Sequence, residues 1–394
     1  MLKKIFRYYD YSIILAVAAL CAVGLVMIYS ASMITTVAQF DVESDFFYNK
    51  QKKSLIFSGI ICLLAMLFPY KLYPKLIKLI VIGNVLMLGL VFIVGHTAGN
   101  AQSWLKFGNL GLQPAEFAKL TVIIYLASVL SKRQNKINNI KETFIGPIGL
   151  TFFIFFIVAI QPDFGTGAII ATIAGVVMLC SGINRKTIIR LGLLALIFVI
   201  IMLPFAYWTG YMSEERMSRF TGASNPFQYA DDQGYQLVNS YIAIGVGGLK
   251  GLGLGESIQK YGYLPEAHTD FIMAVIAEEL GFLGVIIVLS LLIFLILRIL
   301  SLAKRCQDPF GSLICIGIAS MIGIQSFVNL GGLTGILPIT GVPLPFISYG
   351  GSSLLLLMIS IGIVINISFF VNYQEARQQK KQEIQKTSKT IPIH

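Results

Sequence analysis

Residues 271–297 read FIMAVIAEELGFLGVIIVLSLLIFLIL, an apolar stretch in which Glu278 and Glu279 are the only charged side chains. About 20 mostly apolar residues suffice for a helix to cross the hydrocarbon core of a bilayer, so this segment is long enough to span it. Nine further apolar runs of this kind occur along the chain: Ser12–Ser32, Ser54–Phe68, Leu76–Gly95, Glu116–Ser131, Phe144–Ile160, Gly165–Gly182, Ile188–Trp208, Phe310–Leu330 and Ser348–Val371. The pattern predicts an all-α polytopic membrane protein with ten transmembrane helices.

The composition excludes several other classes of protein. Of the 394 residues, 56% are apolar and 12% are charged, and the mean hydropathy is +0.78; soluble domains average about 45–50% apolar and about 25% charged residues. A water-soluble, disordered or secreted disulfide-rich protein is therefore excluded. Four of the five cysteines lie in apolar runs, and no CxxC spacing suggests a zinc site.

The basic residues indicate which side of the membrane each loop occupies. With ten crossings, both termini lie on one side. The segments of that side carry 21 of the 30 basic residues and five acidic ones, whereas the opposite segments carry eight basic and eleven acidic residues. Cytoplasmic loops are enriched in Lys and Arg, so both termini are predicted to be cytoplasmic. The net charge of +11 thus reports membrane topology, and no nucleic-acid partner is expected.

The chain is predicted to form one membrane domain, residues 1–373, followed by a basic cytoplasmic tail, residues 374–394. Within the domain, residues 209–270 form a large extracytoplasmic loop between the seventh and eighth helices, far longer than the usual loop of about 4–6 residues. Six glycines lie between Gly245 and Gly255. Such glycines permit tight turns and the close approach of a ligand or a neighbouring segment.

The end of this loop carries Glu266, His268 and Asp270 at the point where the eighth helix is predicted to begin. An aspartate there can cap the helix, and the positive end of the helix dipole keeps such a carboxylate ionised. An ionised carboxylate can also serve as a general base for a substrate hydroxyl. Capping and catalysis both remain open, and one does not exclude the other.

Three further residues near the outer helix ends have a structural and a functional interpretation. Glu116 and Lys119 are spaced as helical neighbours, so they form either an ion pair inside the bundle or a contact to a phosphate. Trp104 belongs either to the interfacial aromatic belt or to a stacking surface for a sugar or lipid head.

Glu278 and Glu279 lie inside a predicted membrane helix, where ionisable groups usually face a partner or a cavity. At 100° per residue, Glu278 lies about 80° from Asp270 and Glu279 about 180° away, so Glu278 is expected to share the side of Asp270. A hydrogen bond that packs helices together is the favoured role for Glu278.

Two Gly- and Pro-containing segments interrupt helices on the outer side. One surrounds Asp163, and the other, residues 338–353, contains Pro343, Ser348, Gly350 and Gly351. Broken helices at membrane depth normally line protein or a water-filled cavity. The polar residues therefore gather at one face of the membrane, which favours an enzyme on an outer-leaflet substrate or a transporter; spacing alone does not choose between them.

Several motifs resemble the shape, elongation, division and sporulation family. They are GLGLGES at 251–257, YLPEAHTDF at 263–271, EELG at 278–281, GVPLPFISYGGSS at 341–353, QPAEFAK at 113–119 and QPDFGT at 161–166, together with Asn329 and Pro338. The resemblance covers about residues 10–373, and the run 341–353 is highly specific. Within the family, the chain most resembles the cell-division branch of Gram-positive bacteria.

The resemblance implies a peptidoglycan glycosyltransferase of the bacterial cytoplasmic membrane, located at the division septum. Such enzymes polymerise lipid II, the undecaprenyl-pyrophosphate-linked disaccharide pentapeptide, on the outer membrane face. It implies Asp270 as the base that deprotonates the acceptor hydroxyl. The leaving pyrophosphate needs nearby positive charge; the candidates are Lys119 and Lys260, with Arg216 or Arg219 behind them.

The motifs, together with Trp104 in the outer loop before residues 113–119, give the remaining residues of interest. Substrate contacts are expected from Lys119, Glu116, Trp104, Lys260, His268, Glu266 and Ser348; structural or cavity-lining roles are expected for Glu278, Asp163, Pro343, Gly350 and Gly351. No metal ligand cluster is apparent, and a divalent cation, Mg²⁺ or Mn²⁺, stays open as a cofactor. The expected partners are a class B penicillin-binding protein and other septal membrane proteins. The alternatives are a lipid II flippase, a rod-shape or sporulation paralogue with the same chemistry, and a structural division protein.

Overall fold

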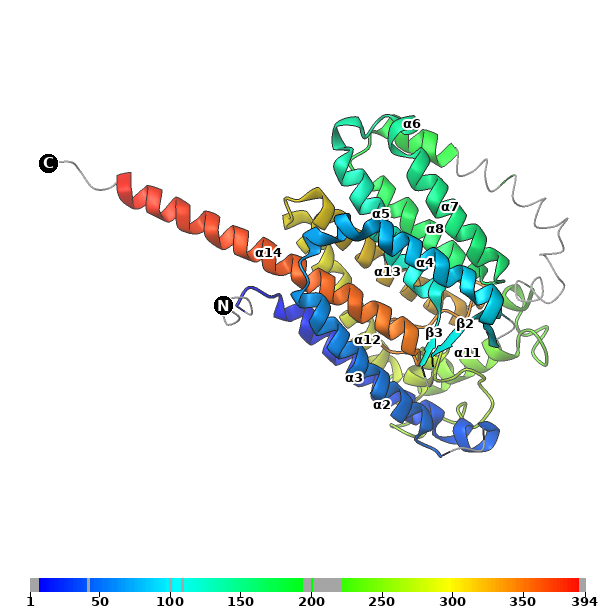
Figure 1. Ribbon diagram of the computed structural model, residues 1–394. Coiled ribbons are helices and arrows are strands. Elements are labelled where there is room, and N and C mark those ends of the chain that lie inside the picture. The colour runs from blue at the N-terminus through cyan, green and yellow to red at the C-terminus, as the bar shows by residue number, and fades with distance from the viewer. Residues whose placement is uncertain are drawn as a thin grey trace.

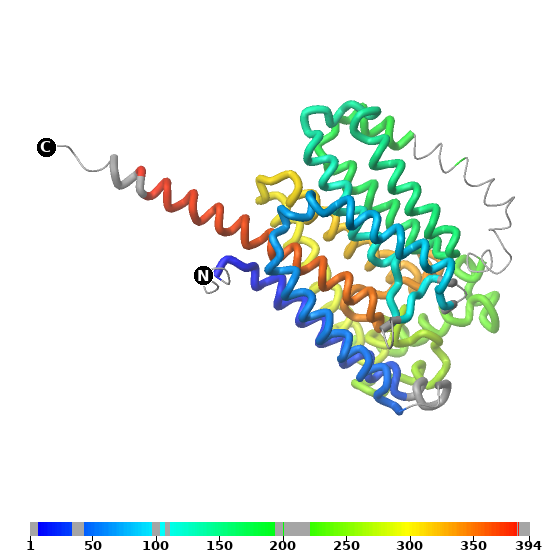
Figure 2. The backbone as a smooth tube through the Cα atoms, viewed as in Figure 1, coloured from blue at the N-terminus to red at the C-terminus, as the bar shows by residue number. Residues whose placement is uncertain are grey.

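The computed structural model describes residues 7–40, 43–98, 101–107, 110–193, 200 and 221–389. Within this part of the chain most residues are helical, and the helices form one bundle (Figures 1 and 2). Among the described residues, six helices contain stretches that are long and apolar enough to cross a membrane. They are α2 (Tyr11–Phe40), α4 (Tyr73–Val94), α5 (Pro114–Lys132), α12 (Ile272–Arg305), α13 (Pro309–Leu333) and α14 (Gly351–Lys389).

The other helices are shorter or less apolar. They are α3 (Phe46–Leu67), α6 (Ile140–Thr143), α7 (Ile145–Ile160), α8 (Phe164–Leu179), α11 (Tyr235–Gly247), η1 (Tyr70–Leu72) and η2 (Gln134–Lys136). A helix coincides with nine of the ten predicted apolar runs. The seventh run, Ile188–Trp208, lies mostly outside the described residues, although residues 185–193 are helical.

Helix α5 lies at the centre of the bundle. It packs against α4, α8 and α13, while α3 packs against α14 and α12 packs against α2, α11 and α13. Most of the side chains of α5 are buried, among them the charged pair Glu116 and Lys119. By contrast, α4 presents large apolar side chains such as Leu79 and Ile93 on its surface. A predominantly apolar helix is either buried in protein or exposed to lipid, and α5 is the buried case.

The prediction of an all-α fold is wrong between α4 and α5. There, β1 (His96–Ala98), β2 (Ala101–Phe107) and β3 (Leu110–Leu112) form an antiparallel sheet in the order β1-β2-β3. Ser103 and Leu105 are buried, Trp104 is half-buried and Lys106 is exposed, which is the two-residue alternation of a strand. Strands this short leave a weak signal in the sequence, because only a few residues show the alternation.

Helix α12 is interrupted at Gly281, whose φ of 65° and ψ of −165° are not helical. The freed carbonyls of Glu278 and Glu279 accept hydrogen bonds from the backbone N–H groups of Leu252 (2.9 Å) and Gly253 (3.0 Å). On the other side of the break, Phe282 N–H donates to the Gly248 carbonyl (2.9 Å). The glycine-rich segment is therefore joined to the helix backbone, and α12 is the neighbouring segment that these glycines approach.

Three elements meet at the end of the bundle predicted to be cytoplasmic. Arg298 of α12 pairs with Asp10 beside α2 (2.8 Å), and Arg305 of α12 pairs with Glu375 of α14. The predicted tail belongs to α14, which is helical as far as Lys389 and extends away from the bundle (Figure 1).

Candidate functional site

Asp270 lies in the turn that leads into α12. The Thr269 and Phe271 N–H groups both donate to the Glu266 carbonyl (3.1 and 3.2 Å), and Glu266 adopts a positive φ of 55° in this turn. The residue at the N-cap of α12 is Phe271, and no side chain caps the helix. The expectation that Asp270 caps this helix is therefore wrong, because α12 begins at Ile272 and its N-cap residue is Phe271. The Asp270 carboxylate is thus not committed to the helix end.

The backbone of Asp270 is fixed by α13. Nδ2 of Asn329 donates to the Asp270 carbonyl and to the Val342 carbonyl, each at 2.9 Å. Gly341 follows a left-handed conformation (φ 72°), and a Cβ placed on it would lie 3.6 Å from Oδ2 of Asp270. The loop before α14 therefore lies directly beside the carboxylate.

The environment of Asp270 changes its proton affinity. The residue is half-buried. Burial, and to a smaller degree the nearby Glu266 carboxylate, raise the pKa of Asp270 from 3.8 to about 7. Both effects disfavour the ionised form. A carboxylate with a pKa near neutrality can both take up and release a proton at physiological pH, as a general base must.

Two aromatic side chains pack against His268. Its ring lies 4.4 Å from that of Phe47 and 5.6 Å from that of Tyr349, measured between centroids. The Tyr349 N–H donates to the His268 carbonyl (3.0 Å). Burial lowers the pKa of His268, which keeps the imidazole neutral, and its Nδ1 has no hydrogen-bond partner among the described residues.

A second group of charged residues lies inside the bundle around α5. Lys119 Nζ lies 2.6 Å from Glu116 Oε1, and both side chains are buried. Glu116 Oε2 and the other two N–H donors of Lys119 have no partner within the described part of the chain. Asp163 is close enough for its pKa to respond to both residues, although burial is the main cause that raises it.

Gln113 connects this group with the start of α14. Its Nε2 donates to Asp163 Oδ2 (3.0 Å), and its backbone N–H donates to the Ser352 hydroxyl (3.0 Å). Asp163 also caps α8, because its Oδ1 accepts from the Thr166 N–H (3.1 Å). The two predicted helix breaks are therefore linked through one glutamine.

The loop that contains Pro343 is packed tightly between α2, α3 and α14. Ser348 is buried and its hydroxyl accepts from the Leu344 N–H (2.9 Å), whereas the Gly350 N–H donates to Gln51 Oε1 (3.3 Å). The Gly24 position on α2 touches this loop so closely that a Cβ would lie 2.7 Å from the Ile347 carbonyl oxygen.

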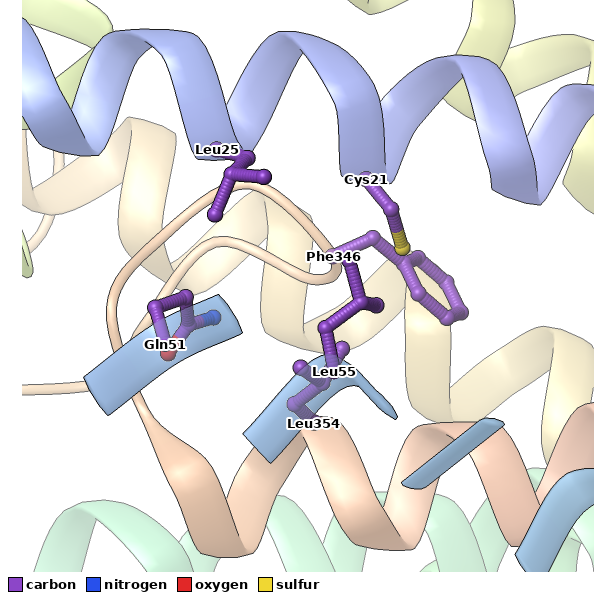
Figure 3. A pocket seen from close by; sticks show the side chains of 6 residues that line it. All are labelled: Cys21, Leu25, Gln51, Leu55, Phe346 and Leu354. Atoms are coloured by element: carbon purple, nitrogen blue, oxygen red, sulfur yellow. The ribbon is translucent and has the colours of Figure 1, made fainter. Parts of the chain in front are cut away.

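Only a small space remains there, among Cys21, Leu25, Gln51, Leu55, Phe346 and Leu354 (Figure 3). Its volume is about 10 Å³, which is room for at most one water molecule. Ser348 and Gly350 thus hold the loop in place through their hydrogen bonds.

Lys260 is buried and satisfied by other residues of the chain. Its Nζ lies 2.9 Å from Glu279 Oε1, 3.1 Å from Ser30 Oγ and 2.6 Å from the Gly255 carbonyl. An ammonium group has three donors, so all are used. Lys260 therefore has no free donor for a phosphate in this structure, in contrast to the expectation from the sequence.

The two glutamates of α12 both hold the preceding loop. Glu278 accepts from the Ser257 hydroxyl and from the Ile258 (2.8 Å) and Gln259 (3.3 Å) N–H groups. The expected sharing of one helix side by Glu278 and Asp270 does not apply, because α12 begins after Asp270. Sequence reasoning missed Ser30 as a partner of Glu279, since one serine in an apolar run carries no distinctive signal.

The structure places Trp104 in the short sheet and Lys260 beside a pocket. Trp104 sits on β2 with Gly111 packed against its ring. A pocket of about 640 Å³ is lined by Val26, Tyr29, Ser30, Met33, Asp45, Tyr48, Leu254, Gly255 and Lys260, and not by Asp270. Arg216 and Arg219 lie outside the part of the chain that the structure describes.

The family model described as "Cell cycle protein", which unites FtsW, RodA and SpoVE, matches residues 11–373. This chain belongs to the FtsW/RodA/SpoVE family. The chain is 52% identical over 385 residues to the probable peptidoglycan glycosyltransferase FtsW of Bacillus subtilis, covering 97% of this chain and 96% of that protein. It is 38% identical over 371 residues to the stage V sporulation protein E of the same organism, covering 92% and 98%.

Solved structures of FtsW/RodA/SpoVE proteins share this fold. A chain in a study of polymerization and crosslinking by a peptidoglycan synthase complex is 28% identical, with a TM-score of 0.73 and coverage of 91% of this chain and 97% of that one. The rod shape determining protein RodA of Thermus thermophilus is also 28% identical, with a TM-score of 0.66 and coverage of 91% and 96%. With six long apolar helices in the part of the chain that the structure describes, this family member is a multi-pass membrane protein.

Asp270 is a carboxylate that can change protonation near neutrality, and Lys119 is a buried lysine with two N–H donors that have no partner among the described residues. A carboxylate of this kind can remove a proton from a hydroxyl, and such a lysine can stabilise an anionic leaving group. The described residues contain no group of three or more His, Cys, Asp or Glu side chains placed to hold a metal ion.

Proposed function

We propose that this chain is a peptidoglycan glycosyltransferase that polymerises lipid II, with Asp270 as its catalytic base. The observation that carries the proposal is the Asp270 carboxylate: it is half-buried, caps no helix and has a pKa raised to about 7. The 52% identity with a probable peptidoglycan glycosyltransferase over nearly the whole chain supports the reaction class.

In the proposed reaction, Asp270 accepts the proton of a sugar hydroxyl on the acceptor. The hydroxyl oxygen forms a bond to the anomeric carbon of the donor sugar, while the bond from that carbon to the pyrophosphate breaks. Undecaprenyl pyrophosphate leaves with the bonding electron pair. One displacement of this kind inverts the anomeric centre and needs one base and no protein nucleophile.

Lys119 is the proposed contact to the leaving pyrophosphate. Two of its N–H donors lack a partner among the described residues, whereas Lys260 has none to spare. A buried ammonium stabilises developing negative charge more strongly than an exposed one. Glu116 and Asp163 orient Lys119, and His268, Glu266 and Trp104 are proposed contacts to the sugar or the lipid head.

For the membrane arrangement, we propose ten spans with cytoplasmic termini and an extracytoplasmic loop at residues 209–270. The distribution of basic residues supports this orientation, and the pairing of Arg298 with Asp10 and of Arg305 with Glu375 supports one common end for three elements. Asp270 then lies near the outer face, where the substrate head would be. Residues 1–373 form the proposed membrane domain and residues 374–394 the cytoplasmic extension.

The division septum is the proposed location, and a class B penicillin-binding protein is the proposed partner. The identity is 52% with an FtsW and 38% with a sporulation protein of one organism, which favours the division branch. The fold is shared with a chain studied in a peptidoglycan synthase complex that polymerises and crosslinks, which supports a crosslinking partner.

A flippase is the less favoured function. It would need a polar path through both leaflets, and Glu278 and Glu279 are the residues in the sequence that suggest one. Both glutamates have partners in the adjacent loop and in Ser30.

The test is a polymerisation assay with lipid II and the purified chain in complex with its penicillin-binding partner. Wild-type protein should form long glycan strands, and Asp270→Asn should form none while it inserts and folds normally. A lipid II translocation assay on the same two proteins separates the functions. Glycan strands made by Asp270→Asn would show that Asp270 is not the base, and translocation without polymerisation would favour the flippase.

A further inference from the structure

Lys260 and Glu279 close a loop that carries Asp270 in its middle. Lys260 Nζ and Glu279 Oε1 are 2.9 Å apart although the residues are 19 positions apart in the sequence. Asp270 lies about midway between them, on the short connection that enters α12. A contact that closes a loop restricts where the residues within the loop can lie.

This ion pair is buried, beside the pocket that Lys260 helps to line. Both side chains have 0% exposure, and Ser30 Oγ of α2 lies within hydrogen-bond distance of both Lys260 Nζ (3.1 Å) and Glu279 Oε1 (2.6 Å). Buried charges are strongly unfavourable without a partner. The pair therefore holds three segments together: α2, the loop at Gly255–Lys260, and α12.

The segment before Lys260 is bound to α12 along its length. The Leu252 and Gly253 N–H groups donate to the carbonyls freed at the Gly281 break, and Glu278 binds the next turn, at residues 257–259. Among the described residues, Lys260 makes the last hydrogen bond to α12 before the chain reaches Asp270.

The segment between Lys260 and Asp270 forms tight turns, so the position of Asp270 depends on the position of Lys260. Leu264 N–H donates to the Gln259 carbonyl (2.9 Å), and the Glu266 carbonyl accepts from Thr269 and Phe271. Leu264 and Phe271 are almost completely buried. A shift at Lys260 thus reaches Asp270 through packed residues and a few hydrogen bonds, without a flexible linker.

We propose that Lys260 and Glu279 are positioning residues for glycosyl transfer: their ion pair keeps the Asp270 carboxylate at the place and in the degree of burial that the reaction needs. This inference rests on the proposed function, because it requires Asp270 to be the base. Glu266 is the charged group that acts on Asp270. From α13 and the loop before α14, the neighbours on Asp270 are Asn329 and Gly341, and neither titrates.

The test uses Lys260→Met in the complex with the penicillin-binding partner. The substitution removes three hydrogen bonds from the loop and keeps the length of the side chain. We expect kcat for lipid II polymerisation to fall at least tenfold, with KM within about twofold of wild type. The pH midpoint of kcat should also move downward from about 7, since a looser loop admits water to Asp270 and lowers its pKa.

A second variant keeps the test decisive if Lys260→Met does not fold. Lys260→Met combined with Glu279→Gln leaves no unpaired buried charge, and it should show the same fall in kcat and the same shift of the pH midpoint. The control is Lys136→Met with Glu142→Gln, which removes an exposed ion pair of the same chemistry and should leave both quantities unchanged.

The outcomes separate the inference from the proposed function. If wild-type protein forms no glycan, the proposed function fails. If wild type is active and the folded double variant keeps its kcat and its pH midpoint, Lys260 and Glu279 do not position Asp270. A lower melting temperature with an unchanged pH midpoint would likewise overturn the inference, because it would assign the pair to stability alone.

Discussion

Asn329 joins Asp270 to the loop before α14, because both hydrogens of its Nδ2 are used: one on the Asp270 carbonyl and one on the Val342 carbonyl, each at 2.9 Å. The side chain comes from α13 and is buried. The position of the proposed base thus depends on a residue about 60 positions away in the sequence. This relationship gives the first prediction.

Replacing Asn329 with Asp should be more damaging than its small change in shape suggests. The carboxylate can donate no hydrogen bond to the two carbonyls, so both acceptors, one buried and one partly buried, lose their donor and face a negative charge. Each unsatisfied group costs about 1–3 kcal/mol. We expect a lower melting temperature and at least a tenfold loss of polymerisation. A variant as stable and as active as wild type would show that this bridge is dispensable.

The activity should depend on the ionisation of Asp270. A base must be deprotonated, so kcat should rise with pH and reach half its maximum near pH 7, where burial and Glu266 place the pKa of Asp270. Glu266→Gln removes the smaller of these two causes and should move the midpoint downward. The pH profile of polymerisation measures both, and a midpoint near pH 4 in wild type would contradict the assignment.

The same raised pKa predicts a stability difference for Asp270→Asn. The folded state binds the proton more tightly than the unfolded chain, so the folded state loses stability as pH rises from about 4 through about 7. Above pH 7 the full cost is present, and the neutral Asn variant avoids it. At pH 8 the variant should melt at least about 2 °C higher than wild type, and the difference should vanish near pH 4.

Lys119 should act on the substrate and not only on Glu116. Lys119→Met combined with Glu116→Gln removes the ion pair without leaving a buried charge, so the fold should survive. We expect kcat/KM for lipid II to fall at least tenfold, because a cation near the leaving pyrophosphate is lost. Steady-state polymerisation kinetics provide the measurement. Unchanged kinetics in this double variant would show that the ion pair of Lys119 with Glu116 has a structural role only.

Gly281→Ala should destabilise the protein strongly. Gly281 has a positive φ of 65°, and a Cβ there would collide with the backbone of Gly251 and Lys250. The strained conformation alone costs about 1–3 kcal/mol. Gly175→Ala is the control: Gly175 lies in α8, where an added Cβ would have no neighbour within 4 Å, and alanine there should be neutral or stabilising. Equal melting temperatures of the two variants would contradict this account of the break.

Much of the helical architecture follows from local sequence. Runs such as Phe310–Leu330 become helices because a long apolar segment in a membrane must form its backbone hydrogen bonds within itself. This requirement does not depend on which other segment packs against the helix. Asp270 and Lys119 can also be recognised in the sequence, because charged residues are rare in and beside apolar helices. The ten-span topology stays a prediction, as do the roles of the site residues.

The contacts between distant segments were decided only by the tertiary structure. The sequence around Lys260 does not indicate that its partners are Glu279 and Ser30. An ammonium group can pair with any acceptor, and the fold determines which acceptor lies close to it. The strands at residues 96–112 are too short for their alternation to be recognised. The break at Gly281 depends on the loop at Gly248–Gly253, whose backbone groups replace helical hydrogen bonds. Hydrophobicity acts on each segment separately, whereas buried polar groups require a specific partner, and that partner exists only once the chain has folded.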